Sequence, residues 1–235
     1  MSNLIFLDTE TTGNDVAKDR LCQVCYKDER GYHTGFFKPP IPISVKAMSI
    51  THITNKTVED AEPFAGSAMK AELEGLLKEG IMVAHNAPFD KAILEAEGVA
   101  VPCYICTLRV ASALDVDAVI PEYNLQYLRY YLDLDVDAHA HDAEDDVKVL
   151  VGVFERLLAK MQQGGMTDDE AISKMVDIST KPLMLKRFAF GKHNGELIAD
   201  VAKTDKGYLQ WLLGQKKAEE APDEVWVHTL ETYLK

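Results

Sequence analysis

The chain has 235 residues, 47% of them hydrophobic, which suits a globular protein with one large and one small domain. It contains no apolar run of the roughly 18 residues that a membrane helix needs, so we expect no membrane contact. Its 38 acidic residues outnumber the 25 basic ones and give a net charge of −13, which taken alone argues against a nucleic-acid partner.

The first predicted element is a buried strand, Asn3–Leu7, that runs into a polar segment ending at Gly13. Its apolar run is too short for a signal peptide, so we expect a soluble, cytoplasmic protein. Side chains alternate along a strand, so Asp8 and Glu10 share one face while Thr9 points to the other. Two adjacent carboxylates suit Mg²⁺ or Mn²⁺, although a solvated strand end would show the same pattern.

Two further strands are predicted at Arg20–Lys27 and Tyr32–Phe37. The cysteines form two CxxC pairs, Cys22/Cys25 and Cys103/Cys106. Residues three apart on a strand face opposite sides, and neither Gly nor Pro turns the chain at the first pair. We therefore interpret all four cysteines as reduced, mostly buried thiols rather than as zinc ligands.

The chain then alternates between predicted helices and strands. A short helix is expected around Met48, a longer one over Glu62–Lys78 and a buried strand over Ile81–Ala84. This strand leads into His85-Asn-Ala-Pro-Phe-Asp90, whose proline suits the first turn of a helix. Asp90 would then face the end of the strand. Alternatively, it would only stabilise the helix start through its interaction with the helix dipole.

An acidic cluster dominates the second half of the chain. It follows a predicted strand at Val101–Thr107 and helices within Leu108–Leu114 and Leu125–Leu132. The cluster itself spans Asp133–Asp146 and leads into a predicted helix over Val147–Met161.

This cluster has two functional interpretations, beside that of a solvated acidic linker. As a calcium loop of the EF-hand type, it would use positions 1, 3, 5 and 12, which are Asp133, Asp135, Asp137 and Glu144. Ala138 stands where such a loop needs glycine, and a partner EF-hand is absent from the sequence. Alternatively His141–Asp146 reads as HxAxxD, with the histidine above a site and Asp146 pointing inward.

Three motifs therefore occur in order: DxE after the first strand, HNxxFD after a later strand and HxAxxD before a late helix. Together they resemble the exonuclease motifs of the DEDD superfamily, in its histidine-bearing DEDDh branch, over about Asn3 to Lys160. The segments Phe188–Gly195 and Gly207–Leu213 resemble the C-terminal module of exodeoxyribonuclease X-type proteins. The resemblance implies an α/β fold with a ribonuclease H-like mixed central sheet flanked by helices and a small C-terminal module.

The same resemblance implies a metal-dependent 3′→5′ exodeoxyribonuclease that releases nucleoside monophosphates from the 3′ ends of single- or double-stranded DNA. Two Mg²⁺ or Mn²⁺ ions would be held by Asp8, Glu10, Asp90 and Asp146. His141 would act as the general base. The candidate substrate contacts are Thr9, Thr11, Met48, His52 and Asn86. The chain departs from the family's His-Gly-Ile-Thr wording, because it has Thr51-His52 in place of His-Gly.

We expect an exonuclease domain over 1–162, a linker helix over 163–180 and a C-terminal module over 181–235. Residues 1–180 carry 16 basic and 30 acidic side chains, whereas residues 181–217 carry 8 basic and 3 acidic ones. The basic block supplies the candidate DNA contacts Lys186, Arg187 and Lys192. Tyr208 and Trp211, three residues apart on a predicted helix, are expected in the core of the module.

Two alternatives remain at this level. An RNA 3′→5′ exonuclease would use the same acids and histidine, since selectivity depends on contacts around the 2′ position. A calcium-binding interaction protein would use the loop at residues 133–144. The sequence also leaves open the preference for single or double strands, the processivity, the pathway and the oligomeric state.

Overall fold

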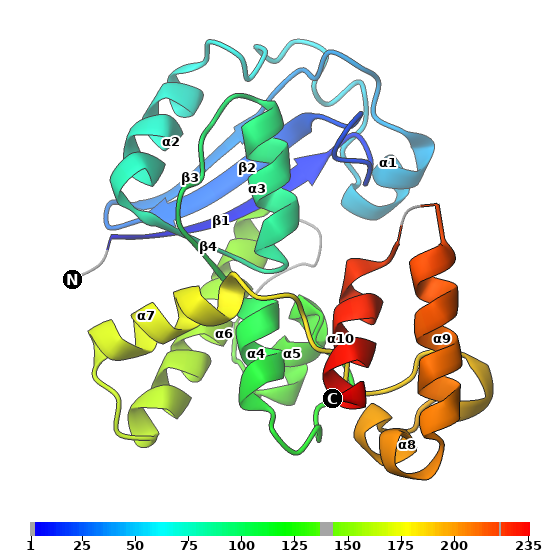
Figure 1. Ribbon diagram of the computed structural model, residues 1–235. Helices are drawn as coiled ribbons and strands as arrows, with labels where there is room; N and C mark the ends of the chain where they lie inside the picture. Colours follow the sequence, from blue (N-terminus) through cyan, green and yellow to red (C-terminus); the bar gives the residue numbers. More distant parts are fainter. Residues whose placement is uncertain (1–2, 137–142, 221) are drawn as a thin grey trace. The chain divides into compact units, whose positions relative to one another are not determined.

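The structure, a computed structural model, describes residues 3–136, 143–220 and 222–235 (Figure 1). These residues form two units. The first contains residues 3–110 and 122–179, and the second contains residues 111–121 and 180–235. The C-terminal unit is thus assembled from two separate pieces of the chain. Within the described ranges, every helix is too short or too polar to cross a membrane.

The first unit is built on a five-stranded mixed sheet with the strand order β3-β2-β1-β4-β5. The strands are β1 (Leu4–Thr11), β2 (Leu21–Asp28), β3 (Gly31–Phe36), β4 (Ile81–Ala84) and β5 (Tyr104–Cys106). The central strand β1 pairs antiparallel with β2 and parallel with β4. Because β1 is covered on both faces and flanked on both sides, its first residues form a continuous apolar run.

Helices cover both faces of this sheet (Figure 1). On one face, Ile5 and Leu7 of β1 pack in a common core with residues of α2 (Ala68–Glu79) and α3 (Ala87–Ala96). On the other face, Phe6 meets the Phe154 ring of α6 (Ala143–Gln163) edge to face, with 5.2 Å between the ring centroids. Alternate residues of β1 therefore face different helices, and this separation decides which side chains can share a site.

The remaining helices of this unit are α1 (Val45–Thr51), α5 (Leu125–Tyr131) and α7 (Asp168–Ser179), while α4 (Thr107–Leu114) carries the chain towards the second unit. The expected helix over Glu62–Lys78 begins later, at Ala68. Ser67 ends the preceding turn and accepts a hydrogen bond from the Lys70 amide at 3.1 Å. A serine in this capping position satisfies an amide that the helix leaves open, so the helix starts there.

Helix α7 lies in the segment predicted as a linker helix, 163–180. The helix begins with a capping box, in which Thr167 donates to the Glu170 carboxylate from its amide and its hydroxyl, both at 2.8 Å. The helix belongs to the first unit, where it packs against β5 and α6. At its end, the Ser179 hydroxyl oxygen accepts a hydrogen bond from the Cys106 amide at 2.7 Å.

All four cysteines lie in described parts of the chain and are thiols outside any disulfide, as predicted. Cys22, Cys25 and Cys106 are buried and Cys103 is half-buried. Burial raises the pKa of Cys22 to about 12, and the nearby Glu10 carboxylate adds to this shift. Such a thiol stays protonated at neutral pH and is a poor metal ligand.

The C-terminal unit contains a short 3-10 turn, η1 (Gly191–His193), and helices α8 (Ile198–Thr204), α9 (Lys206–Ala218) and α10 (Glu224–Leu234). Its core is formed by Phe188, Ile198, Val201, Leu209, Leu212, Trp226 and Leu230. Tyr208 packs edge to face against Phe188 and is half-buried. The core prediction for Trp211 is wrong, because 57% of this residue is exposed. Leu209 and Leu212 occupy the inward positions of α9 instead.

Two basic residues of this unit bind the separate segment 111–121. Lys186 donates from its ammonium to the carbonyl oxygen of Asp115. Arg187 donates to the carbonyl oxygen of Ala118 at 3.0 Å and to that of Gly195 at 3.0 Å. Both side chains therefore stabilise the unit itself. Of the three candidate DNA contacts, Lys186 is half-buried, whereas Arg187 and Lys192 are exposed, with 58% of the Lys192 side chain accessible.

Candidate active site

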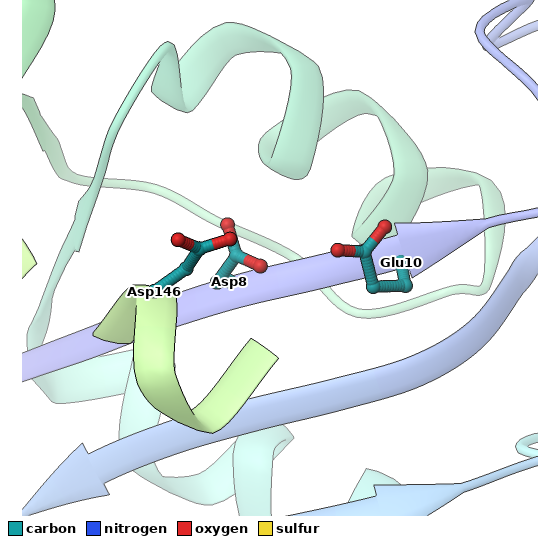
Figure 2. A group of neighbouring side chains, drawn as sticks. All are labelled: Asp8, Glu10 and Asp146. Carbon is teal, nitrogen blue, oxygen red and sulfur yellow. The ribbon is translucent and has the colours of Figure 1, made fainter. Parts of the chain in front are cut away.

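Three carboxylates converge where β1 meets the start of α6 (Figure 2). Asp8 and Glu10 project from β1 on the face that α6 covers, and Asp146 projects from the first turn of α6. Each offers a ligand atom, and these atoms all lie within 4.8 Å of one another. Strand alternation and the position of Asp146 at a helix start thus bring together three acids that are 138 residues apart at their extremes.

The chemistry of these donors fits a divalent cation. Asp146 is buried, and Asp8 and Glu10 are half-buried, so their charges repel one another more strongly than they would in water. Carboxylate oxygens are the ligands that Mg²⁺ and Mn²⁺ prefer, and a positive ion offsets the repulsion. In the part of the chain that the structure describes, this is the one group of three or more such side chains with metal-binding geometry.

Asp90 lies on a different side of β1. Strand β4 pairs with β1 only as far as Phe6, so the Thr9 amide lies beyond the pairing. Asp90, in the first turn of α3, accepts this amide at 3.1 Å and the Thr9 hydroxyl at 2.8 Å, both through Oδ1. Burial raises the pKa of Asp90 well above its ordinary value, and the two Thr9 hydrogen bonds partly oppose this shift. Asp90 therefore contacts β1 at Thr9, between Asp8 and Glu10, but its carboxylate is not one of the three that converge.

The other candidate substrate contacts have diverse environments. The Thr11 hydroxyl donates to the Gly13 carbonyl oxygen at 2.6 Å and so stabilises the turn after β1. Asn86 is exposed, with a φ of 61°, at the start of α3. Met48 is half-buried on α1, and His52 is exposed at the end of that helix with a φ of 58°. Glycine adopts this left-handed conformation without strain, which explains why the family motif has glycine where this chain has His52.

Histidine 85 belongs to the scaffold. Its Nδ1 lies 2.9 Å from the Thr107 hydroxyl and its Nε2 lies 2.8 Å from the Tyr123 carbonyl oxygen. Desolvation lowers the pKa of His85 to about 4, so the ring is neutral at physiological pH. With both nitrogens engaged, this ring is unsuited to proton transfer. His141 lies outside the described residues.

The predicted calcium loop is described only in part. Asp137 and Ala138 lie outside the described residues. Glu144, the expected position 12, has an oxygen 3.1 Å from the Lys148 ammonium and accepts the Thr34 hydroxyl at 3.2 Å. The described acids of this segment do not form a metal-binding group with one another.

One further residue, which carries no signal in the sequence, contacts the converging acids. Gln126 of α5 donates from Nε2 to Asp146 Oδ1 at 2.7 Å. Its amide oxygen accepts from Arg129 at 3.4 Å, and Arg129 also donates to the carbonyl oxygen of Val136. The three residues thus connect Asp146 with the chain just before the segment that contains His141. A glutamine on the polar side of a predicted helix gives no sequence signal for this contact, which depends on how α5 packs against α6.

Comparison with known proteins agrees with this geometry. The sequence model of a family described as "Exonuclease" matches residues 5–154. The chain belongs to this exonuclease family. A second model, "Exodeoxyribonuclease X-like C-terminal", matches residues 188–217. The resemblance to the exonuclease motifs is thereby confirmed, and the protein is a nuclease.

Curated relatives agree with this assignment. Exodeoxyribonuclease 10 of Escherichia coli K12 is 30% identical over 220 residues, which cover 89% of this chain and 90% of the relative. The DNA polymerase III subunit epsilon of Treponema pallidum is 31% identical over 168 residues, covering 65% of this chain and 74% of that one.

Among solved structures, Exonuclease X in complex with 5′ overhanging duplex DNA matches with a TM-score of 0.58 and 25% identity, covering 75% of this chain and 99% of that one. Escherichia coli Exonuclease I, solved with a dT13 oligonucleotide, shares the fold at a TM-score of 0.58 and 20% identity, over 70% of this chain and 42% of its own. The expected ribonuclease H-like fold is confirmed.

Replacing Gln126 by alanine should lower metal affinity or nuclease activity about 10- to 100-fold, because a hydrogen bond that orients a ligand carboxylate is lost. Mn²⁺ titration by calorimetry and the rate of strand-end hydrolysis would measure both quantities. Gln163→Ala, an exposed glutamine at the end of α6, is the matched control and should behave as the unaltered exonuclease. Equal metal affinity and equal activity in Gln126→Ala would show that the contact does not orient Asp146.

Proposed function

We propose that this exonuclease removes nucleotides from the 3′ ends of DNA with the aid of divalent metal ions and releases nucleoside monophosphates. The observation that carries the proposal is the convergence of Asp8, Glu10 and Asp146 within 4.8 Å. Relatives support DNA as the substrate, since one is named an exodeoxyribonuclease and another was solved with duplex DNA. An RNA exonuclease remains the second candidate on the chemistry of the acids alone.

Asp8, Glu10 and Asp146 would hold the metal, with Asp90 as a fourth carboxylate beside them and with two Mg²⁺ or Mn²⁺ ions as the proposed complement. Bound ions of this kind acidify a water molecule and stabilise charge on the leaving 3′ oxygen. The three converging acids would otherwise repel a DNA phosphate, so substrate binding at this site should depend on the metal. Thr9 keeps Asp90 in place through its two hydrogen bonds.

His141 is proposed as the general base that takes a proton from the attacking water. The proposal rests on its place in the HxAxxD motif, five residues before Asp146. The unperturbed pKa of histidine, about 6.5, suits a base at neutral pH. Thr11, Met48, His52 and Asn86 are proposed contacts of the terminal nucleotide.

The first test is a gel time course with matched DNA and RNA oligonucleotides labelled at the 5′ end. With Mg²⁺ or Mn²⁺ we expect a ladder of DNA products that shorten from the 3′ end, together with mononucleotides, and no cleavage in chelator. Substrates labelled at the 3′ end should release their label in the first turnover. Cleavage that begins at the 5′ end, or that proceeds equally in chelator, would refute the proposal. Faster degradation of the RNA would favour the second candidate.

A further inference from the structure

An exposed tryptophan stands out on the C-terminal unit. Trp211 of α9 is 57% exposed, although the same unit buries its other tryptophan, Trp226, in the core. The aliphatic side chains Leu209 and Leu212 fill the inward face of α9, so the fold does not need the Trp211 indole for its core. A single exposed apolar side chain is common on a protein surface, so whether this one belongs to a binding site depends on the groups that lie beside it.

The indole ends a continuous row of groups. Its ring centroid lies 5.6 Å from that of Tyr208, and the Lys192 ammonium lies 5.1 Å from the Tyr208 centroid. Lys192 also pairs with Asp205 at 2.5 Å, which positions the ammonium over the phenol ring. The Tyr208 hydroxyl can lie this close to the backbone of Gly191 only because that residue has no side chain. A Cβ at Gly191, whose φ is 73°, would lie 2.6 Å from the hydroxyl oxygen.

The surface beside the indole is open along the helix. Gly207 and Gly214 lie four residues before and three residues after Trp211, on the same face of α9. Among the described residues, a Cβ added to Gly214 would meet no atom within 4 Å, and one added to Gly207 would meet only Asp205 Oδ1 at 3.9 Å. Neither position carries a side chain that could cover the ring, so a flat group can lie against the indole.

The charge of the surrounding chain identifies the class of ligand. Within the C-terminal unit the basic side chains are concentrated in residues 181–217, with 8 basic and 3 acidic side chains and a net charge of +5, whereas residues 218–235 carry a net charge of −4 and residues 1–180 one of −14. Lys192, Lys203 and Lys206 are exposed at or near the same end of α9, where Lys192 also pairs with Asp205 and Lys203 with Asp200. A flat aromatic surface among ammonium groups suits a ligand of bases joined by phosphates, which is unpaired nucleic acid.

We propose that Trp211, Tyr208 and Lys192 form a stacking site for a single-stranded segment of DNA, outside the group of catalytic acids. A base lies against the Trp211 indole, and the adjoining phosphate lies near the Lys192 ammonium. The choice of DNA rests on the proposed function. The site gives an acidic nuclease a place where a polyanion is attracted without a metal ion.

Tryptophan fluorescence tests this site directly. Adding a dT oligonucleotide in chelator, where the catalytic acids lack metal, should quench the emission, because a stacked base contacts the exposed indole. Trp211→Phe should remove the quenching, since the remaining Trp226 is buried. Trp211→Ala should lower the affinity for the oligonucleotide about 5- to 150-fold, as measured by anisotropy with a labelled strand. Lys192→Gln should reduce the salt dependence of binding by about one phosphate contact.

Val116→Ala removes another exposed apolar side chain of the same unit and should leave the affinity unchanged. Quenching that persists in Trp211→Phe, or an unchanged affinity in Trp211→Ala, would overturn the proposal. An unchanged affinity together with a changed oligomeric state would assign the surface to a second copy of the chain. Cleavage without quenching would refute this site and leave the proposed function intact, whereas quenching without cleavage would do the reverse.

Discussion

Asp8→Asn should reduce strand-end hydrolysis on the order of 1000-fold or more. Asparagine keeps the shape of the side chain but removes one of the three negative charges that converge within 4.8 Å. The lost charge weakens metal binding, and with it the stabilisation of the transition state, which amounts to several kcal/mol. The rate of mononucleotide release and the Mn²⁺ affinity should therefore fall together. Asp146→Asn should have the same effect on both quantities.

A stability measurement separates this explanation from damage to the fold. Without metal, Asp8→Asn should melt at the same temperature as the unaltered protein or higher, because it relieves repulsion between carboxylates. Adding Mn²⁺ should raise the melting temperature of the unaltered protein and have little effect on the variant. Asp60→Asn, an exposed aspartate in a loop of the same unit, is the matched control. Full activity in Asp8→Asn would exclude the three acids as the catalytic metal site.

His141→Ala should lower the rate of hydrolysis about 100- to 10,000-fold, the usual contribution of general acid–base catalysis. Metal affinity should remain unchanged, since the histidine is proposed to act on the water and not as a ligand. A general base must be unprotonated, so the activity of the unaltered protein should rise with pH through the region near 6.5. This rising limb should disappear in the variant.

His85 provides the reference for this experiment. Its pKa of about 4 keeps the ring neutral across the pH range of the assay, so it contributes no titration there. His228→Ala, a histidine of the C-terminal unit, is the matched substitution and should retain both the activity and the pH profile. A rising limb that survives in His141→Ala would mean that another group accepts the proton.

The sequence predicted the parts of the site that follow from local rules. Strand alternation predicted that Asp8 and Glu10 share a face and that Thr9 points away, and the structure has this arrangement. The environment of Asp90 was beyond such rules. It depends on β4 ending before β1 does, which leaves the Thr9 amide for a side chain from α3 to bind. How far two paired strands extend beside each other depends on the whole sheet, so local sequence patterns do not predict it.

Residues whose roles depend on packing were predicted least well. Spacing predicted that Tyr208 and Trp211 would lie together in a core, but Leu209 and Leu212 occupy the inward face of α9, so Tyr208 is only half-buried and Trp211 is exposed. The aromatic rings in this core are those of Phe188 and Trp226, which lie elsewhere in the chain and stack with 5.7 Å between their ring centroids. Gln126 was overlooked for a related reason, because its partner Asp146 lies on another helix.

The division of the C-terminal unit between two pieces of chain has a consequence for synthesis on the ribosome. The segment 111–121 emerges first, and the 58 residues at 122–179 follow before the rest of its unit appears. At roughly 5–20 residues per second, this delay lasts about 3 to 12 s. During that interval the carbonyl groups of Asp115 and Ala118 lack Lys186 and Arg187, their eventual donors. The nascent chain therefore exposes the segment 111–121 without the rest of its unit during this interval. A fragment that ends at Ser179 would never supply the missing part.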